Sequence, residues 1–248
     1  MKLTDTHCHL YNHHYDDINE VLNDSKELGV DRVINNACDI ESFYEVLELS
    51  KEFNNMYVAL GFHPGEGIYS NDLELLNKHV NDDKVVAIGE IGLDYFYTQD
   101  NKKEQQELFR RQLEIAEAVD KPVIIHSREA TQDVMNILKE YKVKGVIHSF
   151  SGSLEVAKEY IKMGFALGVG GVVTFKNCNF KEVLKEIKPE NILIETDSPY
   201  LTPEPNRGKK NMPGYAMDTA RFVANIYHIS VEELISITNE NIKRIFDI

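Results

Sequence analysis

Residues 84–91 read Lys-Val-Val-Ala-Ile-Gly-Glu-Ile, and residues 122–126 read Pro-Val-Ile-Ile-His. Both are short, nearly continuous runs of β-branched and aliphatic residues, a pattern that indicates parallel strands covered on both faces. Between them, Leu108, Leu113 and Ile115 fall on or near one face of a helix whose other positions hold Glu, Gln and Arg. The stretch therefore predicts a strand–helix–strand unit.

The same unit repeats along the chain. Each of eight apolar segments is followed by an amphipathic or charged stretch, and the segments are Lys2–Leu10, Asp31–Cys38, Met56–Phe62, Lys84–Ile91, Pro122–His126, Gly145–His148, Phe165–Val169 and Asn191–Thr196. This alternation argues against a sandwich or a helix bundle. No G-x-G-x-x-G follows a strand, which argues against a dinucleotide-binding sheet. At 248 residues, the chain is predicted to form one α/β domain over residues 1–248, a (β/α)8 or TIM barrel.

The net charge, the hydropathy pattern and the cysteine content limit the possible classes of protein. A net charge of -14 argues against a scaffold that coats nucleic acid, although an enzyme can still handle DNA through bound cations. We expect no membrane association, because no apolar run approaches the roughly 18 residues of a membrane span and the N-terminus is too polar for a signal peptide. Three cysteines without a C-x-x-C motif favour a reducing, cytoplasmic location. Nothing in the sequence demands an obligate protein partner.

Metal-ligand side chains stand at the carboxyl ends of the predicted strands, where barrel active sites are assembled. They are His7 and His9 on the first strand, Glu90 on the fourth, His126 on the fifth, His148 on the sixth and Asp197 after the eighth. A single histidine at a strand end more often packs or forms hydrogen bonds than binds metal. Convergence of all these residues on one rim favours a metal centre.

Strand order divides these ligands into two groups. Residues two apart on a strand share a face, so His7 and His9 point the same way. In a closed barrel the eighth strand pairs with the first, which brings Asp197 to this pair. Consecutive strands bring His126 and His148 to the other side, and the two oxygens of Glu90 can reach both groups. This arrangement suits two metals about 3.5–4 Å apart.

The donor set indicates the chemistry. Imidazole and carboxylate ligands suit zinc, manganese, iron or cobalt and do not choose among them. Such metals lower the pKa of water toward about 7. Asp197 and Glu90 are the candidate catalytic residues, and Asp197 is placed to accept the proton of the attacking water and return it to the leaving group.

Six motifs carry a resemblance to a known family. They are Asp5–Leu10 (DTHCHL), Gly61–Pro64 (GFHP), Gly89–Tyr95 (GEIGLDY), Pro122–Arg128 (PVIIHSR), His148–Gly152 (HSFSG) and Glu195–Pro199 (ETDSP). In this order the motifs resemble the TatD family of metal-dependent deoxyribonucleases, in the amidohydrolase-like superfamily, essentially end to end. The resemblance implies hydrolysis of DNA phosphodiester bonds, typically from the 3′ end and with single strands as the expected substrate.

The resemblance also implies roles for individual residues. Two divalent ions (zinc, manganese, magnesium, cobalt or nickel) would be held by His7, His9, Glu90 and Asp197, and by Glu90, His126 and His148. The predicted phosphate and substrate contacts are His63, Arg207, Lys209 and Asn211, and Tyr95 is a candidate for stacking on an unpaired base. Met212 stands where the family commonly has an acidic residue, which predicts altered substrate contacts and an intact metal site.

Two other functions stay open at this point. Hydrolases of lactones, cyclic amides, phosphotriesters or aminoacyl esters share this ligand plan, and fold does not determine substrate. Those enzymes often bridge their metals with a modified lysine on the fourth strand, whereas this chain has Glu90 there. The second alternative is a non-catalytic metal-binding scaffold. The presence of all six ligands argues against it, because such a scaffold has no need to keep them.

Overall fold

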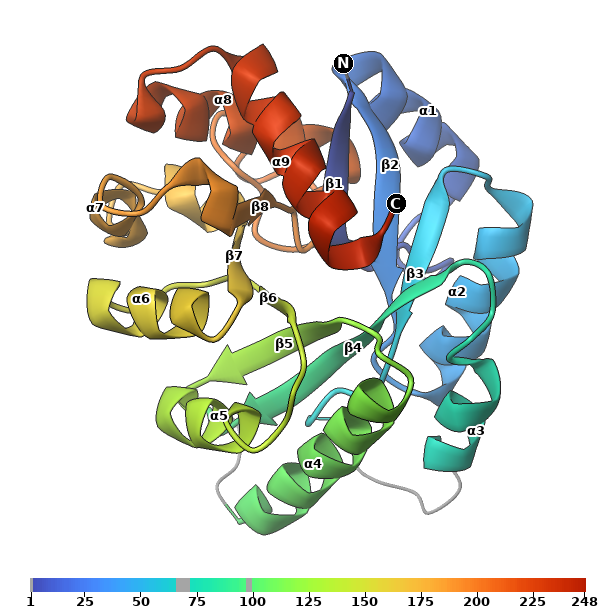
Figure 1. Ribbon diagram of the computed structural model, residues 1–248. Coiled ribbons are helices and arrows are strands. Elements are labelled where there is room, and N and C mark those ends of the chain that lie inside the picture. The colour runs from blue at the N-terminus through green and yellow to red at the C-terminus, as the bar shows by residue number, and fades with distance from the viewer. Residues whose placement is uncertain (1, 66–71, 97–99) are drawn as a thin grey trace.

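Eight strands form a single parallel sheet in the order β1 to β8, and helices separate successive strands (Figure 1). The computed structural model describes residues 2–65, 72–96 and 100–248. The strands are β1 Leu3–Cys8, β2 Val30–Asn36, β3 Met56–Leu60, β4 Val85–Asp94, β5 Val123–Arg128, β6 Gly145–Ile147, β7 Phe165–Val169 and β8 Ile192–Ile194. The α-helices are α1 Ile18–Leu28, α2 Ile40–Glu52, α3 Asp72–His79, α4 Lys102–Ala118, α5 Thr131–Leu138, α6 Leu154–Lys162, α7 Phe180–Leu184, α8 Ala216–Tyr227 and α9 Val231–Phe246. Short 3-10 turns are η1 Gly171–Thr174, η2 Pro189–Asn191 and η3 Pro213–Tyr215.

The first and last strands meet and complete the ring. Thr6 Oγ1 donates to the carbonyl of Ile194 at 3.1 Å, and the His9 amide donates to the carbonyl of Ser198 at 2.8 Å. Cys8 and Ser198 form a parallel bridge just beyond β8. These contacts join strands from the two ends of the chain, and the predicted TIM barrel is confirmed.

Strand β4 is longer than the sequence predicts. The strand segment expected from the sequence ends at Ile91, but β4 continues through Asp94 and pairs with β5 as far as Arg128. Gly92 makes this pairing possible, because a Cβ at Gly92 would lie 1.9 Å from the carbonyl oxygen of His126. Its φ of +148° is also one that only glycine adopts readily. The additional strand residues bring Asp94 to the rim of the barrel where the carboxyl ends of the strands lie.

The protein has two apolar cores. The larger core lies between the strands and the surrounding helices. The smaller one lies among the strands, where aliphatic residues such as Ile34, Ile124 and Leu193 pack beside alanines, and α9 covers it with Ile242, Ile245 and Phe246 (Figure 1). Ser230 caps α9 by accepting a hydrogen bond from the Glu233 amide. Because α9 closes one end of the barrel, the other end is free to form a cavity.

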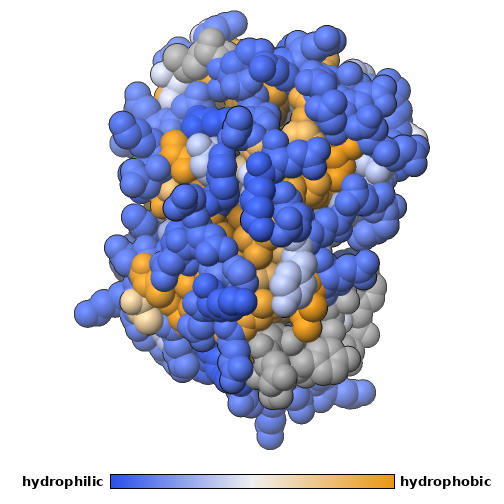
Figure 2. Space-filling view, turned by 90° about the vertical axis from the view of Figure 1, so that its right-hand side faces the viewer, coloured by the Kyte–Doolittle hydropathy of each residue, from blue (hydrophilic) through white to orange (hydrophobic). Residues whose placement is uncertain are grey.

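The outer surface is mostly hydrophilic. Figure 2 shows the side that carries α1, α2 and α3, where polar side chains form most of the surface and apolar ones show in the gaps between them. This is the surface expected of a chain with a net charge of -14. Within the described ranges, every helix is too short or too polar to span a bilayer.

Candidate metal centre

Four ligand atoms from three strand ends converge at the open end of the barrel. Nε2 of His7 and Nε2 of His9 lie 3.1 Å apart. Oε2 of Glu90 lies 3.4 Å from the first of these nitrogens and 3.6 Å from the second. Oδ1 of Asp197 lies 3.9 Å and 3.4 Å from the same two atoms. These are all lone-pair donors, and each carboxylate oxygen lies within 4 Å of both imidazole nitrogens.

The spacing fits a small divalent cation. Nitrogen and oxygen ligands about 2.0–2.2 Å from a tetrahedral metal stand roughly 3.3–3.6 Å from one another. The observed separations of 3.1–3.9 Å bracket that value. The chain thus holds a donor set whose chemistry and spacing both suit a metal.

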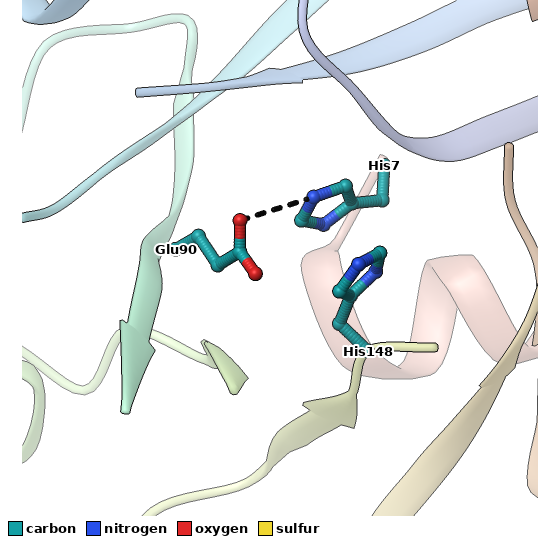
Figure 3. Close-up of side chains that lie close together, drawn as sticks. All are labelled: His7, Glu90 and His148. Atoms are coloured by element: carbon teal, nitrogen blue, oxygen red, sulfur yellow. Dashed lines mark ion pairs between the residues drawn. The ribbon is translucent and has the colours of Figure 1, made fainter. Parts of the chain in front are cut away.

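Glu90 faces two groups at once. One oxygen points to His7 and His9, and the other lies 2.9 Å from Nδ1 of His126. Figure 3 shows Glu90 reaching from β4 toward His7, with the ring of His148 beside that of His7. Burial raises the pKa of the Glu90 carboxyl, but the neighbouring histidines outweigh it and hold the pKa well below its usual value. The Glu90 carboxylate is therefore ionised.

Asp94 holds the far side of the His126 ring. Its Oδ2 lies 3.0 Å from Nε2 of His126, so this imidazole lies between the carboxylates of Asp94 and Glu90. Burial alone would lower the pKa of His126, but the hydrogen bonds to Asp94 and Glu90 raise it to about 9. A carboxylate on one ring nitrogen orients the ring and makes the other a better ligand.

His148 is oriented in the same way by Glu195. Oε1 of Glu195 lies 2.9 Å from Nδ1 of His148 and accepts a hydrogen bond from the Ser149 amide at 2.6 Å. Although burial opposes the charged ring, Glu195 raises the pKa of His148 to about 9, assisted by Glu90 and Asp197. The buried Glu195 carboxylate fits because Gly168 has no side chain: a Cβ there would lie 2.3 Å from Oε2.

A buried carboxyl fixes the two strand ends that carry the first ligand group. Asp5 Oδ1 accepts from the amides of His7 and Thr196, and Oδ2 accepts from the Thr196 hydroxyl at 2.6 Å. Its surroundings exclude water, and burial raises the pKa of Asp5 to about 8. We call this set of contacts the seam staple. It ties β1 to the segment that ends in Asp197.

The structure brings the predicted ligands together unequally. His7, His9, Glu90 and Asp197 meet as expected, but His148 stacks on His7 with ring centroids 3.5 Å apart. Within the described ranges, His126 and His148 share none of the close ligand groups, which are His7–Glu90–His148, His7–His9–Asp197, His9–Cys38–Glu90 and His63–Glu90–His126. Each ring also contacts a carboxylate of its own, Asp94 for His126 and Glu195 for His148. A second metal on Glu90, His126 and His148 stays a prediction.

The predicted substrate contacts lie in different environments in the structure. His63 lines the cavity at the open end of the barrel, and its ring lies 4.4 Å from that of His126. Tyr95 is buried with its hydroxyl 2.9 Å from Asp133, so the structure contradicts a stacking role for it. Asn211 is also fully buried and donates to the carbonyls of Thr196 and Tyr200, which corrects its assignment as a substrate contact.

The basic loop lies outside the cavity in this structure. Arg207 packs on the ring of Phe175, and Lys209 donates to Asn206. Both are exposed, and neither lines the cavity. Their contact with substrate stays a prediction that this geometry does not support.

Sequence reasoning overlooked several residues of the site. Asp94 and Glu195 were missed although each lies an even number of residues from a ligand, Glu90 and Asp197 respectively, which is the spacing of one strand face. Arg128 and Cys38 also line the cavity. Arg128 ends β5, two residues after His126 on the same strand, and that position was a usable signal.

A parallel eight-stranded barrel with histidines and carboxylates at the carboxyl ends of its strands defines a class of metal-dependent hydrolases. Comparison with known proteins narrows this class. The family model described as TatD related DNase matches residues 4–247. The chain belongs to the TatD family.

Relatives match the chain over nearly its whole length. A Bacillus subtilis protein named as an uncharacterized metal-dependent hydrolase, YabD, is 45% identical over 99% of both chains. The human deoxyribonuclease TATDN3 is 30% identical over 98% of this chain and 94% of its own. The crystal structure of YJJV, a TatD homologue from Escherichia coli, superposes with a TM-score of 0.90 at 31% identity, covering 99% and 98% of the two chains.

Proposed function

We propose that the chain is a 3′–5′ exodeoxyribonuclease that hydrolyses phosphodiester bonds at single-stranded DNA ends. The observation that carries the proposal is the cluster of His7, His9, Glu90 and Asp197, whose donor atoms are spaced as metal ligands. The family match and the naming of a human relative as a deoxyribonuclease support DNA as the substrate. We further propose two metals per chain, with Glu90 shared and His126 and His148 completing the second site.

The residues of the chain have distinct tasks in this reaction. A divalent metal held here would supply Lewis-acid chemistry, acidifying water and neutralising phosphate charge. Asp197 is one-fifth exposed at the cavity. Burial alone would raise its pKa, but His9 and His148 keep the pKa of Asp197 below its usual value. It is thus ionised at neutral pH and placed to accept the proton of the attacking water.

We propose that two further side chains that line the cavity, His63 and Arg128, contact the phosphate. Burial lowers the pKa of His63 to about 4, so its imidazole is neutral at pH 7. Its Nδ1 accepts a hydrogen bond from the Gly65 amide, which leaves the proton on Nε2 for donation. Of the described residues that line the cavity, Arg128 is the one lysine or arginine. A guanidinium pairs well with the oxygens of a phosphate.

The test is a cleavage assay on end-labelled DNA. Purified protein is incubated with 3′- and 5′-labelled single strands in magnesium, manganese or zinc, and with a chelator. Glu90→Ala is compared with Glu182→Ala, a control on α7 whose carboxylate is exposed and pairs with Lys185. We expect metal-dependent shortening from the 3′ end, lost in the first variant and unchanged in the second.

The outcomes separate the alternatives. If wild-type protein leaves DNA intact but cleaves a lactone or an aminoacyl ester, the hydrolase assignment stands and the DNA substrate is wrong. If wild-type protein binds metal but cleaves nothing, the scaffold function is favoured. Shortening from the 5′ end would overturn the proposed direction alone.

A further inference from the structure

The cavity at the open end of the barrel has two unlike walls. It encloses about 590 Å³, which is within the range of sites that hold small ligands. One wall is formed by aromatic rings, Tyr11, His14 and Tyr200, which we call the aromatic wall. The lining also includes a second, cationic part, Arg128, whose guanidinium stacks on the Phe96 ring at 3.8 Å. An aromatic ligand suits the first part, and an anion suits the second.

The backbone holds Tyr200 at a fixed position beside the metal centre. Its amide donates to the carbonyl of Asp197 at 2.8 Å, and its carbonyl accepts from Asn211 at 2.6 Å. The side chain is nevertheless 53% exposed, which is unusual for a tyrosine so firmly anchored. A rigid backbone thus presents an open ring three residues from a proposed metal ligand.

Its neighbours extend the wall without adding charge. The His14 ring meets Tyr200 edge-on at 5.8 Å and stacks on Tyr11 at 5.3 Å. Burial and the adjacent His13 lower the pKa of His14 to about 4, so the ring is neutral at pH 7. A neutral aromatic surface offers π-faces and hydrogen-bonding edges, which a nucleobase needs and a phosphate does not.

We propose that Tyr200 and His14 form a nucleobase site that receives the base of the terminal nucleotide next to the scissile phosphate. This inference rests on the proposed nuclease function. It assigns stacking to Tyr200, in place of the buried Tyr95. Because every base has a π-face, the site accepts any terminal base. It discriminates against an abasic nucleotide, which has no base to stack.

The experiment compares two oligonucleotides that differ only in the 3′-terminal residue, a normal nucleotide or an abasic tetrahydrofuran. kcat/KM is measured for wild type, Tyr200→Phe, Tyr200→Leu and Tyr44→Leu. Tyr44 is a matched control, because it is 52% exposed on α2 and lies outside the cavity. Base–aromatic stacking predicts that wild type prefers the base-bearing end by about 5- to 150-fold.

The preference should persist in Tyr200→Phe and Tyr44→Leu and disappear in Tyr200→Leu. All four proteins should cleave the abasic end at similar rates, which shows that the metal centre is unharmed. Equal cleavage of both ends by wild type would overturn the nucleobase site and leave the nuclease function standing. An equal loss on both substrates in Tyr200→Leu would also overturn it, because the ring would then support the site and not the base. If wild type cleaves neither, the nuclease function fails and the nucleobase site with it.

Discussion

Replacing Gly168 with alanine tests whether Glu195 governs metal binding. Gly168 lies on β7, and a Cβ there would stand 2.3 Å from Oε2 of Glu195 and 2.6 Å from Oε1. An ordinary contact begins near 3.4 Å, so the carboxylate must withdraw by about 1.1 Å. Because Glu195 is fully buried and held at 2.9 Å by His148 and 2.6 Å by the Ser149 amide, we expect at least one of these contacts to break.

Two effects of different size follow from this displacement. Overpacking a buried site lowers the free energy of unfolding by about 1–3 kcal/mol. Loss of the carboxylate that orients a histidine ligand costs about 10- to 100-fold in metal affinity, or about 1.4–2.7 kcal/mol. The second effect is specific to the metal centre, whereas the first is common to any crowded core position.

Gly170→Ala on the same chain segment is the matched control. A Cβ at Gly170 meets its nearest atoms at 3.8–4.0 Å, and its backbone φ of -92° suits alanine. Metal affinity is measured by competition with a chromophoric chelator, and stability by thermal unfolding without metal. If Gly168→Ala binds zinc as tightly as Gly170→Ala does, Glu195 does not position His148 and the reasoning is wrong.

Three further predictions concern the same end of the barrel. Chelation should lower the melting temperature of wild type, because a ligand present at 100 times its Kd stabilises the fold by about 2.7 kcal/mol, and Glu90→Ala should show little change on the same treatment. Asn211→Ala removes the hydrogen-bond donor to the carbonyls of Tyr200 and the buried Thr196, so denaturant titration should show a loss of about 1–3 kcal/mol, and an unchanged midpoint would contradict this role. NMR should show His14 titrating near pH 4, well below its unfolded pKa of 6.5. Since the unfolded chain takes up that proton first, the stabilising contribution of His14 is present above pH 6.5 and is lost as the pH falls toward 4, and His14→Gln should remove this part of the pH dependence.

The sequence predicts the barrel and the first ligand group well, because both depend on simple periodicities. Continuous β-branched runs mark buried parallel strands, and the carboxyl ends of such strands must meet at one rim. The positions of His7, His9 and Asp197 follow from that rule together with the pairing of the first and last strands. No knowledge of side-chain packing is needed for this step.

The remaining features depend on contacts between distant segments. Asp94 reads as the start of a loop, and only the close approach of Gly92 to β5 extends the strand that carries it. Tyr95 reads as an accessible aromatic residue, but its hydroxyl is held by Asp133 on α5. The orientation of His148 depends on Glu195, which no local pattern around the histidine indicates.

The seam staple makes the candidate metal centre depend on segments from both ends of the chain. Asp5 and Thr196 are 191 residues apart in sequence, and the strands they join come from opposite ends of the protein. Contacts of such long range form only after the intervening chain has been synthesised and folded. A ribosome-bound or truncated product that ends before Asp197 therefore lacks a complete ligand set. We expect the candidate metal centre to be complete only once the segment after β8 has docked against β1.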